Sequence, residues 1–445
     1  MADGDLLYHI FTDTKRFMIR IRFRKTILLA LFFSLMSAWT ASSQPSNSIP
    51  ADSTLSENSE SSQNVEPYES NRSILAHTLA LPSYLLHWST RPFGWSIKWA
   101  EINLPRLLQG ERAPYGIYPL FELGGDVGAA YGALLYHNQF TQYNHKIRLE
   151  ALFGSEEYND FDFSYTIPRF FSGRNQLEIE GEYSNDPVTS LFGGNRSELE
   201  DEELFATERL ETAVEFGRLM SENVSFSIES RYRQIDISTN ETILSDPLPV
   251  VSDSLRGTTT LFSVGSQLKI DAANASPRIL RGSRYILGLQ WNRSLTDDRF
   301  EYLRYDLEWH QFLPLPLLPD TRRLAIKTRL HKAEALSGKE VPFFDYPKLG
   351  SSIDLRGFRT DRFRDDGSLL VTVEYRYPLW DFADVVLFVD EGQVFSRFED
   401  IALDKFKTSF GFGFHLISTS GFAFRSEFAF SRESSRVILS INPNF

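Results

Sequence analysis

The chain of 445 residues contains no cysteine and only 4 methionines. The lack of cysteine excludes a disulfide framework, a thiolate metal site, a cysteine nucleophile and a lipid-modified N-terminal cysteine. Positive charge is also in deficit, with 46 Lys and Arg against 59 Asp and Glu and a formal net charge of −13. A large nucleic-acid interface needs clustered Lys and Arg, so this class of partner is disfavoured.

Aromatic residues, in contrast, are abundant. They make up 14% of the chain, with 37 Phe and 18 Tyr, yet the mean hydropathy is −0.26. Many bulky apolar side chains are therefore mixed into a polar background. Length alone suggests two or three soluble domains of roughly 150 residues. Composition leaves a soluble all-β protein and a membrane barrel both open.

Residues 1–43 are typical of a secretory signal peptide. Basic residues at positions 20–25 precede an apolar stretch at 26–38, and small residues at 41–43 offer a cleavage site. The apolar stretch is shorter than the roughly 20 residues that a transmembrane helix needs. Met18 is an alternative start of the chain. These features predict an exported protein.

Two segments of different character follow the signal peptide. Residues 44–72 are rich in Ser, Asn, Glu and Pro, and we expect a disordered tether because so few apolar residues are available for burial. Residues 73–114 carry Leu, Ile and Trp interrupted by prolines, which predicts an amphipathic helical segment. Two interpretations of this segment stand: a broken helix packed on the following domain, or a helix at the membrane interface or inside a pore.

From Tyr115 to Phe445 the pattern has a period of two, which predicts strands and no helices. In residues 409–417, for example, Phe and Leu alternate with Ser, Gly and His. A soluble sandwich would carry many charges on its polar face, whereas here that face is mostly Gly, Ala and Ser. This composition is expected for the lumen of a membrane barrel, and its small residues favour an open channel.

The spacing of the strands supports the same fold. Connections of two kinds largely alternate along the chain, which is typical of short periplasmic turns and long external loops. The short ones are 219–223, 381–384 and 418–420, and the long ones are 185–203, 236–256 and 333–368. At about 20 residues per strand and connection, the chain fits sixteen strands, each long enough for the 9–11 residues that cross a membrane. We therefore predict an all-β fold, a transmembrane antiparallel β-barrel of sixteen strands spanning residues 115–445.

Four sequence features near the C-terminus occur in a particular order. The longest predicted loop contains Leu355, Arg356, Gly357 and Phe358; the next strand contains Glu374, Arg376 and Pro378; the one after contains Phe388, Asp390 and Gly392; and the chain ends on Phe445. Four letters alone would be a weak signal. The combination of L-R-G-F, E-x-R-x-P, F-x-D-x-G and a terminal Phe is specific.

This order resembles the bacterial surface-antigen barrels of the outer-membrane assembly superfamily, which includes BamA, TamA and the two-partner secretion transporters. The resemblance is strong over residues 340–445 and weaker, mainly by strand rhythm, over 115–340. The hallmark of these proteins is an external loop whose (V/L)RG(F/Y) tip folds back into the barrel lumen. The resemblance implies location in the bacterial outer membrane and a contact between Arg356 of the loop and acidic residues of the wall.

The strand phases agree with that contact. Apolar residues at the odd positions from Leu369 onward form a lipid-facing set, which turns Glu374 and Arg376 toward the lumen. On the next strand, Asp390 and Gly392 also have the inward phase. An arginine on an inserted loop can bridge two such carboxylates with charge-assisted hydrogen bonds.

The loop motif has further implications. We expect Gly357 to let the loop tip turn sharply, and Gly392 to leave room beside it. The simpler alternative places Arg356 on an external loop without a partner. A catalytic pair formed by Glu374 and Asp390 is disfavoured, because an adjacent arginine would lower the pKa of both carboxyls whereas a general acid needs a raised one.

The last strand carries a further pattern. Val437, Leu439, Ile441 and Phe445 share one phase. They look like the C-terminal signal that assembly machinery reads in new barrel proteins. They also fit the last lipid-facing strand, and both interpretations can hold together.

Several features expected of relatives or enzymes are missing. Members of the superfamily usually carry periplasmic POTRA modules, and residues 44–114 show no pattern of that kind. The chain has no G-x-S-x-G elbow, unlike the patatin-like lipases that share this barrel, and its 8 His show no metal-ligand spacing. We therefore expect no catalytic residue, no metal and no cofactor.

Two functions from different classes remain. The first is a barrel that assists insertion or translocation of proteins or lipids at the outer membrane. The second is a static outer-membrane pore or structural barrel without assembly activity. A further option beside these two is a subunit docked to a larger assembly complex by its N-terminal helices. The expected partners are outer-membrane lipids and other outer-membrane proteins or an assembly complex, with no nucleic acid.

Overall fold

The computed structural model describes residues 114–441, except 126–127, 155–156, 172, 193–202, 239–255, 274–280, 297, 316–321, 381–382 and 418–422. The predicted signal peptide, the tether at 44–72, the helical segment at 73–114 up to residue 113, and the terminal Phe445 lie outside these residues. Among the described residues, no helix is long and apolar enough to cross a membrane.

Sixteen strands form the wall of the barrel, and two short strands lie in a loop. The wall strands are β1 (Tyr115–Gly125), β2 (Gly128–His137), β3 (Lys146–Gly154), β4 (Asn159–Pro168), β5 (Asn175–Leu191), β6 (Glu203–Ser221), β7 (Val224–Ser238), β8 (Gly257–Asp271), β9 (Gly282–Ser294), β10 (Glu301–Pro314), β11 (Arg323–Ala335), β14 (Gly367–Trp380), β15 (Ala383–Phe395), β16 (Lys407–Ile417), β17 (Ala423–Phe430) and β18 (Ser435–Ile441). The loop strands are β12 (Lys348–Leu349) and β13 (Phe363–Arg364).

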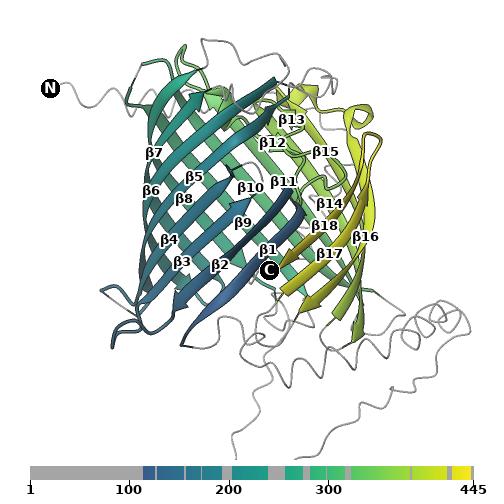
Figure 1. The fold of residues 1–445 in the computed structure, drawn as a ribbon, viewed down its shortest axis with the longest axis horizontal. Coiled ribbons are helices and arrows are strands. Elements are labelled where there is room, and N and C mark those ends of the chain that lie inside the picture. Colours follow the sequence, from purple (N-terminus) through teal and green to yellow (C-terminus); the bar gives the residue numbers. More distant parts are fainter. Residues whose placement is uncertain are drawn as a thin grey trace, which may run out of the picture. The chain divides into compact units, whose positions relative to one another are not determined.

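The wall closes on itself, because every strand pairs antiparallel with its neighbour in the chain and β1 pairs with β18 (Figure 1). The neighbours β11 and β14 are joined by the long loop that contains β12 and β13. Closure gives every wall strand two partners, which removes the free sheet edges that a bilayer would not tolerate. The predicted sixteen-stranded antiparallel barrel is confirmed.

Residues that alternate along the wall strands lie on opposite faces of the wall, as the period-two pattern predicts. Along β15, Leu387 and Val389 are exposed while Val386, Phe388 and Asp390 are buried. On β16, Phe410 and Phe412 are exposed in the same way. The exposed face of the strands is the apolar one, as in a barrel whose outside contacts lipid.

The connections differ from the prediction in two respects. The loop expected at 185–203 is shorter, because β5 and β6 continue to pair beyond a bulge between Asp186 and Thr189. Three single-turn 3₁₀ helices also occur where no helix was expected: η5 (Phe343–Asp345), η6 (Phe398–Asp400) and η7 (Leu403–Lys405). They lie in loops, where i→i+3 bonds such as Asp345 N to Pro342 O supply backbone partners that a strand neighbour would otherwise provide.

Candidate functional site: the loop inside the barrel

The loop between β11 and β14, residues 336–366, packs against the inner wall of the barrel. Its side chains Leu349, Leu355, Phe358 and Phe363 form a buried cluster with Leu370 of β14 and Val394 of β15. The rings of Phe358 and Phe363 are 5.2 Å apart between centroids in an edge-on arrangement. The loop therefore has an apolar core of its own, shared with the wall.

One anchor of the loop is Asp345 of η5. Its carboxylate accepts hydrogen bonds from Arg233 of β7 and Tyr302 of β10, and all three side chains are buried. Burial raises the pKa of Asp345, but the positive charge of Arg233 outweighs it and holds the pKa below its usual range. The neighbouring Phe343 and Phe344 pack on a buried cluster formed by Phe205, Ile235 and Ile237.

The second anchor is Arg356, whose side chain is 3% exposed. Its Nε and Nη2 donate to the two carboxylate oxygens of Asp390 at 3.0 and 2.8 Å. Its Nη1 donates to Glu374 at 3.0 Å and to Glu427 at 3.2 Å. The guanidinium carbon also lies 3.4 Å from the ring centroid of Phe388. One guanidinium group thus joins the loop to three strands, β14, β15 and β17.

Further donors complete the surroundings of the three carboxylates. Asp390 accepts from Thr372 Oγ1 at 3.0 Å and Ser409 Oγ at 3.2 Å, and Glu374 accepts two bonds from Arg376. His415 Nε2 lies 2.7 Å from Glu427. A buried charge network of this kind costs several kcal/mol when one member is removed, because the others are left unpaired.

The structure thus brings four of the predicted residues, Arg356, Glu374, Asp390 and Arg376, into one cluster. It adds Glu427 and His415, which the motifs had not singled out. Both have the inward phase of their strands, and that phase is the sequence signal that could have found them.

Gly392 and Gly357 both lie at close contacts, and Gly357 also lies in the turn expected there. A Cβ atom at Gly392 would lie 2.9 Å from Leu349 of the loop. The left-handed residue of the tip is Leu355, at φ 51°, and Gly357 is not among the residues with positive φ. A Cβ at Gly357 would instead lie 2.7 Å from the backbone of Phe430 and 2.9 Å from Ser409. The chain does turn at Gly357, because Phe358 N donates to the carbonyl of Leu355 at 3.0 Å across Arg356 and Gly357, but this turn needs no positive φ at Gly357. Close approach of the loop to the wall is the physical reason for glycine.

The tip of the loop also contacts the last hairpin, β17–β18. Ser431 Oγ and Ser434 Oγ each donate to the carbonyl of Gly357 at 2.7 Å, and Arg436 donates to the carbonyl of Phe358. Arg362 forms a two-pronged ion pair with Glu433. The loop therefore holds the outer end of this hairpin as well as the wall.

The hairpin ends at the closing contact of the barrel, which we call the seam: the pairing of β1 with β18. In the described residues the seam has three residue pairs, from Phe121–Ile441 to Leu123–Leu439, whereas β17 and β18 share seven. Val437 is exposed and the adjacent Ile438 is buried, so Val437 has the outward phase. The seam is the shortest pairing between wall strands in the part of the chain that the structure describes.

The small lumen residues of β16 do not leave an open path, contrary to expectation. A Cβ at Gly411 would lie 2.4 Å from the ring of Phe388, and one at Gly413 would lie 2.6 Å from the side chain of Glu427. These glycines make room for the side chains around Arg356. On this wall, the space is occupied.

The opposite wall is different in character. A cavity of about 320 Å³ along β3–β7 is lined by six carboxylates, from Glu150, Asp162, Glu178, Glu180, Glu182 and Glu211, and by the two arginines Arg148 and Arg231. We call this surface the acidic wall. Among the described residues, no group of three His, Cys, Asp or Glu is arranged to hold a metal ion.

The protein-family model described as "Omp85 superfamily domain" matches residues 141–435 of the chain. The fold is similar to the crystal structure of BamA from Haemophilus ducreyi lacking POTRA domains 1–3, at 15% identity and a TM-score of 0.57, over 74% of this chain and 70% of that one. CdiB from Acinetobacter baumannii (13%, TM-score 0.49, 76% and 66% covered) and CdiB from Escherichia coli (11%, 0.49, 76% and 69%) are more distant. No curated protein matches the chain in sequence.

Proposed function

The chain belongs to the Omp85 superfamily of bacterial outer-membrane barrels, and on that premise we propose that it assists insertion or translocation of proteins or lipids at the outer membrane. The proposed site comprises Leu355, Arg356, Gly357 and Phe358 of the loop, with Glu374 and Asp390 as acidic partners and Arg376 and Gly392 in support. Val437, Leu439, Ile441 and Phe445 are proposed as the C-terminal assembly signal.

The observation that carries the proposal is the position of the loop tip. The tip lies between the buried charge network of the wall and the β17–β18 hairpin, which ends at the seam. On one side the tip is bound by the buried network of Arg356, Asp390 and Glu427. On the other side the same tip holds the β17–β18 hairpin through the carbonyls of Gly357 and Phe358. That hairpin ends at the short seam.

A mechanism follows from this connection. While Arg356 is bound, the hairpin is fixed and the seam stays paired. Displacement of the tip would remove the donors and acceptors that hold the outer end of the hairpin, and the three seam pairs would be the first pairing to open. A strand of a client protein could then pair with the exposed backbone edge, since an unpaired edge is a template for an added strand.

The test is depletion of the protein in its host, followed by quantification of the outer-membrane proteome. The proposal predicts that several other barrel proteins decrease together. A change confined to small-solute uptake would contradict it.

A static pore is the second candidate, and the acidic wall is the observation that favours it. A lumen cavity lined by six carboxylates and two arginines would attract cations. Conductance of the purified barrel in a planar bilayer separates the two functions. A steady cation-selective current in the wild type supports the pore, whereas a current that rises only when Arg356 is replaced supports a lumen closed by the loop.

The remaining proposals concern chemistry and partners. We propose that the protein is not an enzyme, because the three carboxylates around Arg356 are all bound by its guanidinium group and none is left free to act as a general acid. Its partners would be outer-membrane lipids together with other outer-membrane proteins or an assembly complex.

A further inference from the structure

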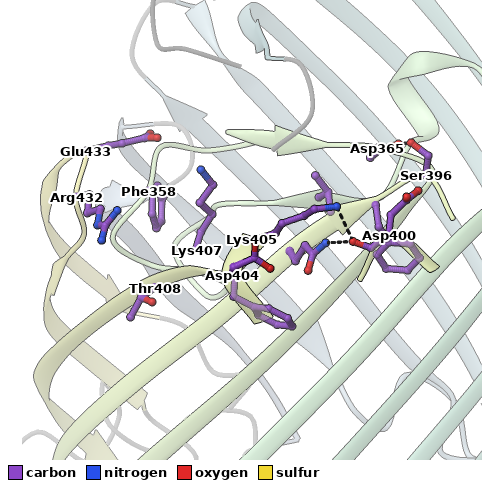
Figure 2. A pocket seen from close by; sticks show the side chains of 14 residues that line it. Phe358, Asp365, Ser396, Asp400, Asp404, Lys405, Lys407, Thr408, Arg432 and Glu433 are labelled. Carbon is purple, nitrogen blue, oxygen red and sulfur yellow. Dashed lines mark hydrogen bonds between the residues drawn. The ribbon is translucent and has the colours of Figure 1, made fainter. Parts of the chain in front are cut away.

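A cavity of about 660 Å³ lies at the end of the barrel that carries the long loop (Figure 2). The inserted loop contributes Phe358 and Asp365 to it, and the other lining residues come from β15, β16 and the β15–β16 and β17–β18 connections. Of the residues around Arg356, only Phe358 takes part. The cavity is therefore distinct from the loop anchors and from the acidic wall.

Three of the four carboxylates that line this cavity are already bound. Asp365 accepts from Ser396 Oγ at 2.9 Å, Asp400 accepts from the backbone N of Arg397 at 3.1 Å, and Glu433 is paired with Arg362. The fourth, Asp404, is exposed. Asp400 also lies 3.8 Å from Arg397 Nε, so two of the four negative charges are paired with arginine, while three cations, Lys405, Lys407 and Arg432, line the same cavity.

The cationic side chains that line the cavity have fewer acidic partners. Lys405 Nζ donates to the backbone carbonyl of Asp400 at 2.9 Å, which is a neutral acceptor. Lys407 and Arg432 have no ion-pair partner among the described residues, and Lys407 Nζ lies 5.3 Å from the ring centroid of Phe363. In Figure 2, Arg432 and Lys407 lie toward one end of the cavity with Phe358 between them. Two cationic groups thus face one space with an aromatic side chain beside them.

Beside this cavity, the first residues of β16 have a strand partner on one side only. The first residues of β16, Lys407 to Ser409, pair with β15, but the pairing of β16 with β17 begins only at Phe410. Thr408 lines the cavity and shares its outward phase with Phe410, which is 56% exposed on the apolar face of the barrel. Through Thr408 the cavity therefore reaches the outward face of β16, next to the exposed apolar side chain of Phe410.

We infer that this cavity is a binding site for the phosphate group of a saccharide headgroup, presented by a lipid of the outer leaflet. Lys407 and Arg432 would bind the phosphate through charge-assisted hydrogen bonds. Asp404 would accept from sugar hydroxyls, and Phe358 would contact the ring. A volume of this size suits a phosphorylated sugar, and the outward-facing Thr408 places the cavity beside the exposed face of Phe410, where the acyl chains would lie.

The test uses the purified full-length barrel in detergent and native mass spectrometry with lipid A, a diphosphorylated disaccharide lipid. Each charge-assisted contact contributes roughly a tenfold change in affinity. We expect Lys407→Gln and Arg432→Gln each to weaken lipid A binding about tenfold, and the double variant more. Lys407→Arg should keep most of the affinity because it keeps the charge.

Lys339→Gln is the matched control. It removes a cation from the same end of the barrel, where Lys339 pairs with Asp298 rather than lining the cavity, and should leave lipid A binding unchanged. Heat-modifiable migration on gels checks that each variant is folded, and Arg432, which is exposed on a turn, carries the test alone if Lys407→Gln does not fold.

The source of the phosphate is decided by a second arm with the deacylated, diphosphorylated disaccharide in isothermal titration calorimetry. If the wild type binds the deacylated disaccharide and the double variant does not, the site also takes soluble anions. If the wild type binds lipid A but not the deacylated disaccharide, the site needs the lipid. Equal lipid A binding by the wild type and the double variant, or equal loss in Lys339→Gln, would overturn the inference.

Discussion

The two walls of the barrel lumen use charge in opposite ways. On the wall formed by β14–β17, Arg356 is enclosed by Asp390, Glu374 and Glu427, and the loop occupies the space. On the acidic wall, six carboxylates and two arginines line an open cavity. The arginines of the ion pairs there are more exposed: the side chains of Arg209 and Arg231 are 39% and 27% exposed, against 3% for Arg356, although Glu211, the partner of Arg231, is buried. Charge therefore binds the loop on one wall and lines an unfilled cavity on the other.

The comparison is tested first by one substitution made on each wall. Arg356→Ala leaves Asp390 and Glu427 buried without their guanidinium partner and should lower the free energy of unfolding by about 3–5 kcal/mol. The loop should also become sensitive to protease, while the barrel still forms because its strand pairing does not pass through the loop. Arg209→Ala, in a half-exposed pair, should cost at most about 1 kcal/mol. Urea unfolding and limited proteolysis measure both, and equal effects would abolish the distinction.

Substitution of Asp345, the other anchor of the loop, should lower the free energy of unfolding by less than Arg356→Ala does. Asp345→Asn removes the charge that Arg233 and Tyr302 bind and should lower the free energy of unfolding by roughly 1.5–3 kcal/mol. Proteolysis should then begin in residues 336–366. A loop that stays as resistant as in the wild type would show that η5 is not an anchor.

The stabilisation that Asp345 contributes to the loop should depend on pH in one definite direction. The folded pKa of Asp345 is lowered, so its stabilisation is fully present above the unfolded pKa of about 4 and is lost as the pH falls through the lower folded value. Loop protection should therefore be constant from pH 7 down to about pH 4 and fall only below that. Loss of protection between pH 7 and pH 5 would contradict the assignment.

A pair of glycines tests the close packing of the loop tip. Gly357→Ala places a Cβ against the Phe430 backbone and should cost about 1–3 kcal/mol, since overpacking displaces the hairpin. Gly181→Ala on β5 meets no atom within 4 Å and is the control. Hydrogen exchange of β17 and β18 measures the effect, and similar exchange in both variants would contradict the account.

The smallest effect is expected on the acidic wall. Glu180→Gln should change the free energy of unfolding by less than about 0.5 kcal/mol, because the side chain faces an open cavity. It should nevertheless reduce the cation preference of any current through the barrel, measured as a reversal potential in a salt gradient. A large loss of stability would show that the acidic wall is packed rather than open.

Much of this architecture follows from local patterns in the sequence. Alternation at residues 409–417 and the inward phase of Glu374 and Asp390 are properties of single strands, so they can be read directly. Glu427 was missed because its partner lies 71 residues away on the inserted loop, and no local rule selects it from other inward carboxylates. The turn at Gly357 could be predicted, but its close contact with Phe430 could not, since that contact depends on how deeply the loop enters the lumen.

The central claim is that the seam opens when the protein works, and a chain without cysteine allows it to be tested directly. Glu122 of β1 faces Ser440 of β18, so Glu122→Cys with Ser440→Cys would place one removable disulfide across the seam. Cells that depend on this variant should lose other barrel proteins from the outer membrane under oxidising conditions and regain them with reductant. Unchanged levels of those proteins with the seam cross-linked would contradict the account.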